Sequence, residues 1–441
     1  MPGRHLLELR ADLWRVPLLL CLATLLLFLV TVRVDLAAAH GALRLPDWLS
    51  IGGPDDARAI LGAMLGAVST VLALIFSVAL LVLSKAVSQF GPRILYRFVR
   101  DGITQLTIGL FLASFVHTLL ALVVTRQMGA HQFVPQLTLL CSVLLVIVSF
   151  AFLVVFSHRT AVSIQTQNVV AHIVADLQGA LAERAAVASV YPALAQTPAG
   201  IAALEALRAR CAAEGGVVRA WRTGFVQEVD VEALLAVADA ADVAGRLLHR
   251  PGQFVLQDAP LCQLVPATRT EELTPAIQGA IKIGPHRTLK QDFEFGIAQL
   301  VEIGLRALSP AVNDTFTGLT CIDWLGDAIR TIHASPVPRE AYPGGSGALR
   351  LLWSPPRFER IVKTAFDQIR QAGAGNPAVH IRLLQTFAQL APHLAEAPLR
   401  EALLAQVEAI WEATSRESLV KADRADIEAA YRIAREALGA R

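Results

Sequence analysis

Four long apolar runs, nearly free of charged residues, occupy the chain as far as Phe156 and dominate what it can fold into. The hydrocarbon core of a bilayer is about 30 Å thick, so a helix needs roughly 20 apolar residues to cross it. Charged residues make up only 17% of the 441 residues, against about 25% in an ordinary soluble domain. The sequence therefore predicts a membrane protein with a large soluble region. The spans are expected at Val16–Val32, Ala59–Leu83, Ile103–Val124 and Val134–Phe156.

The first run has an alternative interpretation as a cleaved signal peptide, because Ala37, Ala38 and Ala39 follow it. The length of its apolar core and the position of Arg33 before the alanines favour a membrane span instead.

Four spans place both termini on the same side of the membrane, and that side is rich in basic residues. These are Arg4, Arg10, Arg15, Lys85, Arg93, Arg97 and Arg100. On the other side, four arginines are diluted by four aspartates: Arg33, Arg44, Arg58 and Arg126 with Asp35, Asp47, Asp55 and Asp56. Because basic residues favour the cytoplasmic side, we expect both termini to be cytoplasmic.

Overall charge and cysteine usage narrow the function classes further. The formal net charge is only +2, which gives no basic field of the kind that nucleic-acid binding requires. The five cysteines include no C-x-x-C pair, so neither a disulfide framework nor a zinc site is expected. We predict no cofactor and no nucleic-acid partner.

The second span carries a stripe of small residues spaced so that they share one helical face. The stripe consists of Gly62, Gly66, Ser69, Ala73 and Ser77. Small residues allow two helix backbones to approach closely. Packing within one subunit, an interface in a homo-oligomer and the lining of a pore are all compatible with this stripe.

Basic residues follow this span on the cytoplasmic side: Lys85, Arg93, Arg97 and Arg100. The three arginines lie opposite apolar residues in a predicted short amphipathic helix, a pattern typical of anchoring to lipid headgroups. If subunits assemble around an axis, the same residues would form a cationic ring at the inner mouth.

His117 is the one ionisable residue deep in the third span, and Ser114 and Thr118 lie beside it. Buried polar groups in a membrane usually face protein or water. No acidic residue is expected at comparable depth, so a neutral, hydrogen-bonded histidine is favoured over a proton relay.

Beyond the spans, periodicity predicts a mostly α-helical soluble region with one small β-rich module. The expected organisation is a transmembrane domain at 1–158 with an interfacial helix near 92–101, a helical extension at 159–213, the β-rich module at 214–267, a helical hairpin at 268–332 and a helical bundle at 333–441. Two half-motifs, Thr223–Val226 and Arg250–Val255, resemble the halves of a barrel-sandwich module of the biotinyl/lipoyl type, with a helix at Val231–Ala240 between them. That module type carries its cofactor on a lysine. No lysine occurs between Lys85 and Lys282, so no carried cofactor is expected.

The predicted hairpin contains the highest density of polar residues set among apolar ones. Thr288 can cap its first helix, which must end before Pro310, and Asn313 or Asp314 can cap the second. The candidate polar cluster consists of Gln291, Asp292, Glu302, Arg306, Asn313 and Asp314. Its carboxylates, together with Glu294 and Asp323, could hold a divalent cation. Capping and pairing along the helix explain them without one, so no metal is predicted.

Several of these segments together resemble a known family. They are Ser88–Arg93, Arg100–Asp101, Arg250–Gly252, Arg287–Asp292 and Leu305–Asp323, and they look like the bacterial membrane proteins of domain-of-unknown-function family 2254. The resemblance covers nearly the whole chain, although Gly91 stands where the family is expected to have serine. It implies a bacterial inner-membrane protein with an N-terminal bundle of four spans, and it implies no activity.

Two functions of different classes follow. The chain contains no P-loop, HExxH, nucleophile elbow or dinucleotide fingerprint, so no catalytic residues are assigned and an enzyme is not expected. The leading hypothesis is a homo-oligomeric, channel-like protein with a cytoplasmic vestibule or gate and a preference for anions. The alternative is a non-conducting membrane-anchored scaffold or sensor whose tail binds a small ion, another ligand or a partner protein.

Overall fold

The chain folds into two compact units, Met1–Asn168 and Val169–Arg441. The computed structural model describes residues 14–41, 46, 53–90, 101–125, 127–128, 131–163, 166–190, 198–335, 340–354, 357–394 and 397–439. The segment that carries Arg93, Arg97 and Arg100 lies outside the described residues. The interfacial helix near 92–101 therefore stays a prediction.

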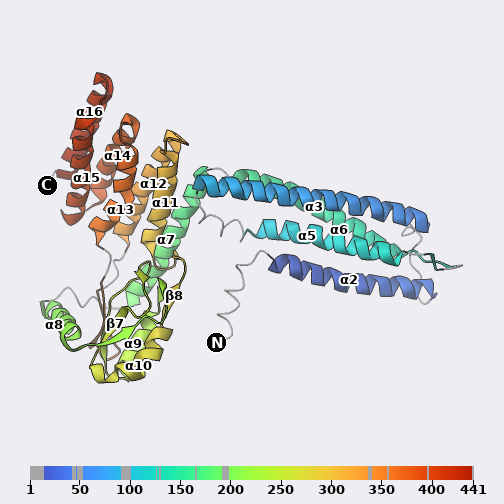
Figure 1. Cartoon of the computed structure of the whole chain (residues 1–441), viewed down its shortest axis with the longest axis horizontal. Coiled ribbons are helices and arrows are strands. Elements are labelled where there is room, and N and C mark those ends of the chain that lie inside the picture. The colour runs from blue at the N-terminus through green and yellow to red at the C-terminus, as the bar shows by residue number, and fades with distance from the viewer. Residues whose placement is uncertain are drawn as a thin grey trace. The chain divides into compact units, whose positions relative to one another are not determined.

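Four helices in the described part of the first unit are long and apolar enough to cross a membrane, as the sequence predicts. They are α2 (Arg15–Ala39), α3 (Pro54–Phe90), α5 (Gly102–Val124) and α6 (Gln136–Ser163), drawn from dark blue to green in Figure 1. A short hairpin of β1 (Gln127–Met128) and β2 (His131–Gln132) lies between α5 and α6. Because α3 has 37 residues, it is about 55 Å long at 1.5 Å per residue and extends well beyond a hydrocarbon core.

Helix α5 is the centre of this bundle and packs against α2, α3 and α6. Half of its membrane-length window is buried, compared with 22% for each of the other three spans. Its Phe111 is completely buried among Val68 and Ile75 of α3 and Phe156 of α6. The other three helices consequently cover α5 and expose most of their own apolar side chains.

The second unit combines helices with short strands. Its helices are α7 (Thr166–Val190), which begins just before the unit boundary, α8 (Pro198–Glu214), α9 (Val231–Ala240), η5 (Ala267–Arg269), α10 (Thr270–Gly279), α11 (Phe293–Ala307), α12 (Thr315–Ala334), α13 (Phe358–Ala372), α14 (Pro377–Leu390), η6 (Ala391–His393), α15 (Ala397–Arg416) and α16 (Lys421–Gly439). Its strands are β3 (Gly216–Arg219), β4 (Gly224–Val229), β5 (Ala244–Leu247), β6 (Phe254–Val255), β7 (Pro260–Val265), β8 (Ile281–Gly284), β9 (Ala341–Pro343) and β10 (Leu349–Trp353).

The β-rich module is not the small closed barrel that the half-motifs suggested. Its described strands form two open sheets, in the orders β3-β7-β5-β10-β9 and β6-β4-β8. The half-motifs do meet, because Gly224 of β4 pairs with Val255 of β6. The other edge of β4 is taken by β8, however, and β10 arrives from beyond α12 to pair in parallel with β5. Both additions come from outside the predicted 214–267 module, and they extend the sheets instead of closing them.

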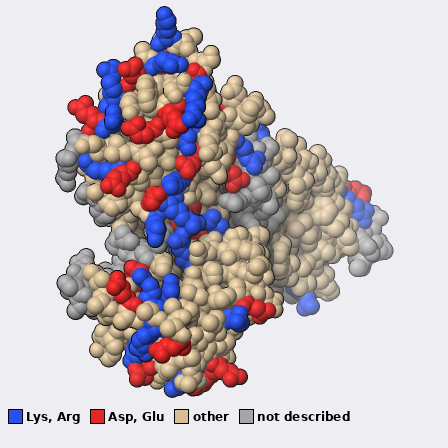
Figure 2. Space-filling view, turned by 60° about the vertical axis from the view of Figure 1, so that its left-hand side comes forward, with Lys and Arg blue, Asp and Glu red and all other residues tan. Residues whose placement is uncertain are grey.

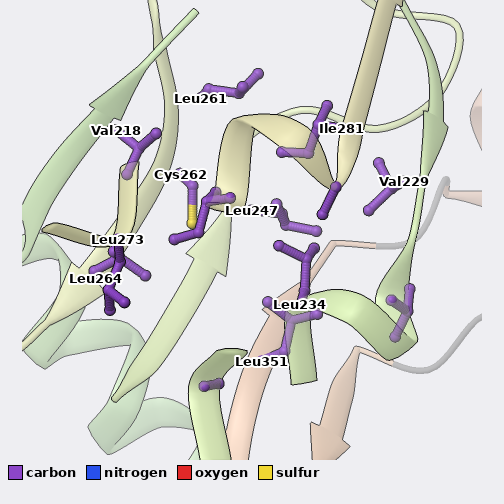
Figure 3. Close-up of a cluster of buried hydrophobic side chains, with 14 of the residues drawn as sticks. Val218, Val229, Leu234, Leu247, Leu261, Cys262, Leu264, Leu273, Ile281 and Leu351 are labelled. Atoms are coloured by element: carbon purple, nitrogen blue, oxygen red, sulfur yellow. The ribbon is translucent and has the colours of Figure 1, made fainter. Parts of the chain in front are cut away.

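A continuous apolar core fills the space between these sheets and helices α9 and α10. Figure 3 shows side chains from strands and helices pointing into it, including Leu247 of β5, Leu234 of α9 and Leu351 of β10. Each is no more than 5% exposed. Helix α9 occupies the predicted interval because Asp230 caps its first turn, accepting a hydrogen bond from the backbone N–H of Ala233 at 3.0 Å.

Helices α11 to α16 form a stack of helical hairpins within the described residues. In this stack α11, α13 and α15 make one layer, and α12, α14 and α16 make the second (Figure 1). The arrangement resembles the paired helices of α-solenoids, in which each pair buries its apolar face against its neighbour. The fully buried rings of Phe366 on α13 and Phe387 on α14 meet edge to face, with centroids 4.8 Å apart.

We predict that Phe366→Ala destabilises the second unit by about 3–5 kcal/mol, because it leaves a cavity in this stack. Phe316→Ala is the matched control, since Phe316 is 84% exposed, and it should leave the free energy of unfolding almost unchanged. Denaturant unfolding of the full chain in detergent measures both. Equal effects of the two substitutions would contradict the packing described here.

Candidate functional site

The small-residue stripe of α3 faces away from the other three helices of its own bundle. Gly62, Gly66, Ala73 and Ser77 are exposed and Ser69 is partly exposed. A Cβ atom added at Gly62 or Gly66 would meet nothing within 4 Å among the described residues. Among the described residues, the two glycines of the stripe therefore make no close packing with another helix of this chain.

The opposite face of α3 provides the packing within the bundle. It carries Leu61, Val68, Ile75 and Val82, which are spaced seven residues apart and are at most 8% exposed. The hydroxyls of the stripe donate within the helix, from Ser69 to the carbonyl of Leu65 at 2.7 Å and from Ser77 to that of Ala73 at 2.9 Å. Lys85, further along α3, is exposed.

His117 lies in the interior of the bundle and contributes to a series of hydrogen bonds between α5 and α6. Its Nδ1 is 2.9 Å from Oγ of Ser142, and its ring meets the ring of Phe28 on α2 edge to face. Toward the start of α5, the hydroxyls of Ser114 and Ser149 are 2.7 Å apart. In hydrocarbon such contacts between neutral groups join helices and satisfy polar atoms that lipid cannot.

Asp35, just beyond the predicted end of the first span at Val32, is a buried acidic residue of α2. It lies in α2, which continues to Ala39, and only 3% of its surface is exposed. Its carboxylate accepts hydrogen bonds from the backbone N–H groups of Leu137 and Thr138 and from the Thr138 hydroxyl, at 2.7–3.0 Å. The positive end of the α6 dipole stabilises this buried charge. Asp35 thus acts as a cap that fastens α2 to the start of α6.

In the second unit, the polar residues that the sequence grouped together separate into two sets. Gln291 and Asp292 precede α11, while Asn313 and Asp314 follow it at the other end. Between these ends lie 15 helical residues, which correspond to about 22 Å. The predicted cluster is therefore not a single site.

Helix α11 begins later than predicted because Asp292, not Thr288, caps it. The Asp292 carboxylate accepts a hydrogen bond from the backbone N–H of Phe295 at 3.2 Å, while the Thr288 hydroxyl donates to the carbonyl of Gln227 on β4. Gln291 also binds β4: its amide oxygen accepts from Val229 N–H at 2.8 Å, and its amide nitrogen donates to the Val229 carbonyl at 3.1 Å. The loop before α11 is thus fixed to the sheet.

Around the start of α11, three arginines surround two buried carboxylates. Arg287 donates two hydrogen bonds to Asp292, at 2.7 and 3.0 Å. Arg250 donates to Glu294 at 3.0 Å, and Arg360 of α13 lies 3.8 Å from the same carboxylate. Burial lowers the pKa of the Arg250 guanidinium, and the neighbouring Glu294 opposes that shift. We call these five residues the arginine–carboxylate network.

Gly252 allows the loop that carries Arg250 to reach this network. It adopts a φ of +90°, and a Cβ atom there would collide with the carboxylate of Asp292. A side chain at this position would therefore be strained and would also push the loop off Asp292. The network joins the β5–β6 loop, the β8–α11 loop and the first turn of α13.

The remaining predicted polar residues have local roles. Glu302 and Arg306 form an i, i+4 pair within α11 at 3.6 Å, Asp314 caps α12 by accepting from Thr317 N–H at 3.1 Å, and Asn313 is exposed. Among the described residues, no group of three or more His, Cys, Asp or Glu side chains is placed to hold a metal ion. The sequence did not single out Arg360, because it enters the network from a helix far along the chain.

Charges on the surface are interspersed. Figure 2 shows basic and acidic side chains side by side on the face that it displays, with one gathering of Lys and Arg near its middle. This mixture matches the near-neutral net charge.

We predict that Arg287→Met destabilises the second unit by about 3–5 kcal/mol, because it leaves the Asp292 carboxylate buried without its charge partner. Arg330→Met serves as control. Arg330 pairs with Asp327 on an exposed helix face, where an ion pair contributes at most about 1 kcal/mol. Thermal unfolding of both variants in the full chain measures the difference, and similar losses would argue against a special role for the network.

Comparison with known proteins gives a family. The family described as predicted membrane protein (DUF2254) matches residues 10–389. The uncharacterized proteins Mb1321c of Mycobacterium bovis and Rv1290c of Mycobacterium tuberculosis are each 28% identical to this chain over 384 residues, which cover 85% of it and 71% of each relative. No solved structure matches this chain. Because the family's match extends over most of its length, including the four spans and the arginine–carboxylate network, the chain belongs to the DUF2254 family of predicted membrane proteins.

Proposed function

We propose that this membrane protein assembles into a homo-oligomer and forms a channel-like pore, with α3 of each copy facing the shared axis. The observation that carries the proposal is the outward position of the α3 stripe. Gly62, Gly66, Ala73 and Ser77 are exposed on the face opposite the buried Leu61, Val68 and Ile75. A membrane helix gains little from presenting glycine and serine to acyl chains, whereas these residues allow close contact with another helix or with water.

The topology of the proposal follows from charge. Basic residues predominate at the ends of the spans that share a side with the termini, which favours a cytoplasmic location for the second unit. In that orientation the second unit would form a vestibule or gate on the cytoplasmic side of a bacterial inner membrane. Lys85 and the arginines that follow it would then favour anions over cations at the inner mouth. With no catalytic motif in the sequence, the proposal assigns the protein no enzymatic activity.

A specific observation supports a second candidate function, a non-conducting anchor with a sensory or scaffolding tail. The hydroxyls of Ser69 and Ser77 already donate to their own helix, so lipid can cover the stripe without leaving an unsatisfied hydroxyl. In that case the spans only hold the second unit at the membrane.

Disulfide cross-linking separates packing of α3 against α3 from exposure to lipid. We expect Gly66→Cys and Ala73→Cys to form disulfide-linked dimers in native membranes, because the same position of two copies would lie close to the axis. Leu74→Cys is the control: Leu74 is 59% exposed but is rotated by about 100° from Ala73 around the helix. Cross-linking at Leu74 alone, or at none of the three positions, would contradict an α3 interface.

Conductance tests the pore itself. Planar-bilayer recordings of the purified chain should show currents that prefer anions, and Lys85→Glu should shift the reversal potential toward cation preference. Lys282→Glu, which makes the same charge change in β8 of the second unit, should leave the preference unchanged. A silent monomer or a sealed dimer would reject the pore and favour the anchor.

A further inference from the structure

Four polar side chains of the helical stack have buried nitrogen or oxygen atoms without a hydrogen-bond partner among the described residues. They are Arg370 at the end of α13, His380 in the first turn of α14, Gln406 on α15 and Glu417 just after α15. Six of their buried atoms have no hydrogen-bond partner among the described residues: Arg370 Nε, His380 Nδ1 and Nε2, Gln406 Oε1 and both carboxylate oxygens of Glu417. Because buried polar atoms are normally paired, this group is unusual.

The histidine and the glutamate are the two members whose charges can meet. His380 is completely buried, and its Nδ1 lies 3.6 Å from Oε2 of Glu417. That separation is too long for a hydrogen bond but short enough for a strong interaction between charges. The protonation state of this pair therefore matters for how α14 packs on the connection between α15 and α16.

Further charged groups lie on the other elements packed near α14. Helix α13 contributes Asp367 and Arg370, which lie 3.8 Å apart. Asp367 also accepts a hydrogen bond from the Gln406 amide of α15 at 2.7 Å. From α16, Arg424 donates to the backbone carbonyl of Glu417.

Helix α14 itself adds two further influences on His380. Its N-terminus, with Asn376 as cap, places the positive end of the helix dipole beside the histidine. Arg382, two residues further on, is directed to Asp323 of α12 at 3.6 Å. The surroundings of His380 thus contain one close carboxylate, one close guanidinium and a helix end that disfavours a positive charge.

We propose that His380 is a proton-binding site of the second unit, and that its protonation loosens the last hairpin, α15–α16, from α14. The neutral ring fits the buried position. A positive ring in this buried position would lie near the positive charge of Arg370 and the α14 N-terminus, and Glu417 balances this only in part. The ligand is the proton, so the site would make the second unit responsive to acid. This inference stands independently of the pore proposed above.

The direction of the effect follows from the pKa. Burial lowers the pKa of His380 below its ordinary value, Glu417 opposes this shift and Arg370 adds to it. Because an unfolded or opened chain would bind the proton at the ordinary pKa of about 6.5, the folded form loses stability as the pH falls below that value. Above that pH, His380 is neutral in both the folded and the opened form, and its contribution to folding stability is fully present.

Amide hydrogen exchange of the full chain in nanodiscs tests the proposal. Between pH 7.5 and pH 5.5, after correction for intrinsic exchange rates, the opening constant of α14–α16 should rise by up to about tenfold per pH unit below about 6.5. Amides of α11 and α12 serve as an internal reference and should change much less. Unchanged protection of α14–α16 over this range would overturn the proposal.

Variants identify the responsible group. His380→Phe removes both unbonded nitrogens and the titration, so protection of α14–α16 should become independent of pH; His380→Asn does the same if the larger ring is not accommodated. Glu417→Gln removes the opposing charge, so the loss of protection should continue to lower pH than in the unsubstituted chain. The matched control is His393→Phe at an exposed position of η6, which should keep the full acid response. A response that survives in both His380 variants would refute the assignment.

Discussion

The exclusion of water from hydrocarbon is the constraint on which the first unit depends. Lipid offers no partner to the polar groups of a span, and α5, which packs against the other three spans, carries several of the buried polar side chains. His117 and Ser114 meet serines of α6, and Asp35 of α2 finds its donors at the start of the same helix. The same constraint makes the α3 stripe informative, since most of its small residues are exposed in the described part of the chain.

In the second unit, the buried carboxylates at the start of α11 likewise need partners inside the protein. Asp292 caps the helix and pairs with Arg287, while Glu294 is shared by Arg250 and Arg360. A buried charge that loses its partner destabilises the fold. These contacts therefore hold the β-rich module against the first helices of the stack. The acid-sensitive pair of His380 and Glu417 lies further along the same stack. It is less completely bonded, which is what allows it to respond to a proton.

The sequence predicted the structure well where the residues that determine an element all lie in one short segment. The lengths of the apolar runs predicted the four spans, and Asp314 was one of the two residues predicted to cap α12. Predictions failed where a partner came from far along the chain. Thr288 can also cap a helix by residue type, but its hydroxyl donates to the carbonyl of Gln227 on β4. The half-motifs suggested a barrel because no sequence signal near residues 214–267 indicated that β10, about 100 residues further along, pairs with β5.

The sequence by itself determined that the N-terminal part is apolar enough to lie in lipid, that family membership extends along most of the chain, and that the remainder is mainly helical. Hydrophobic length, helix periodicity and capping residues are properties of contiguous segments, and they act before any long-range contact forms. Only the tertiary structure decided which face of α3 is left uncovered, which arginines neutralise Asp292 and Glu294, and that His380 meets Glu417. These outcomes depend on burial and on charges brought together from distant segments, because the energy of a charge or a hydrogen bond is set by what surrounds it.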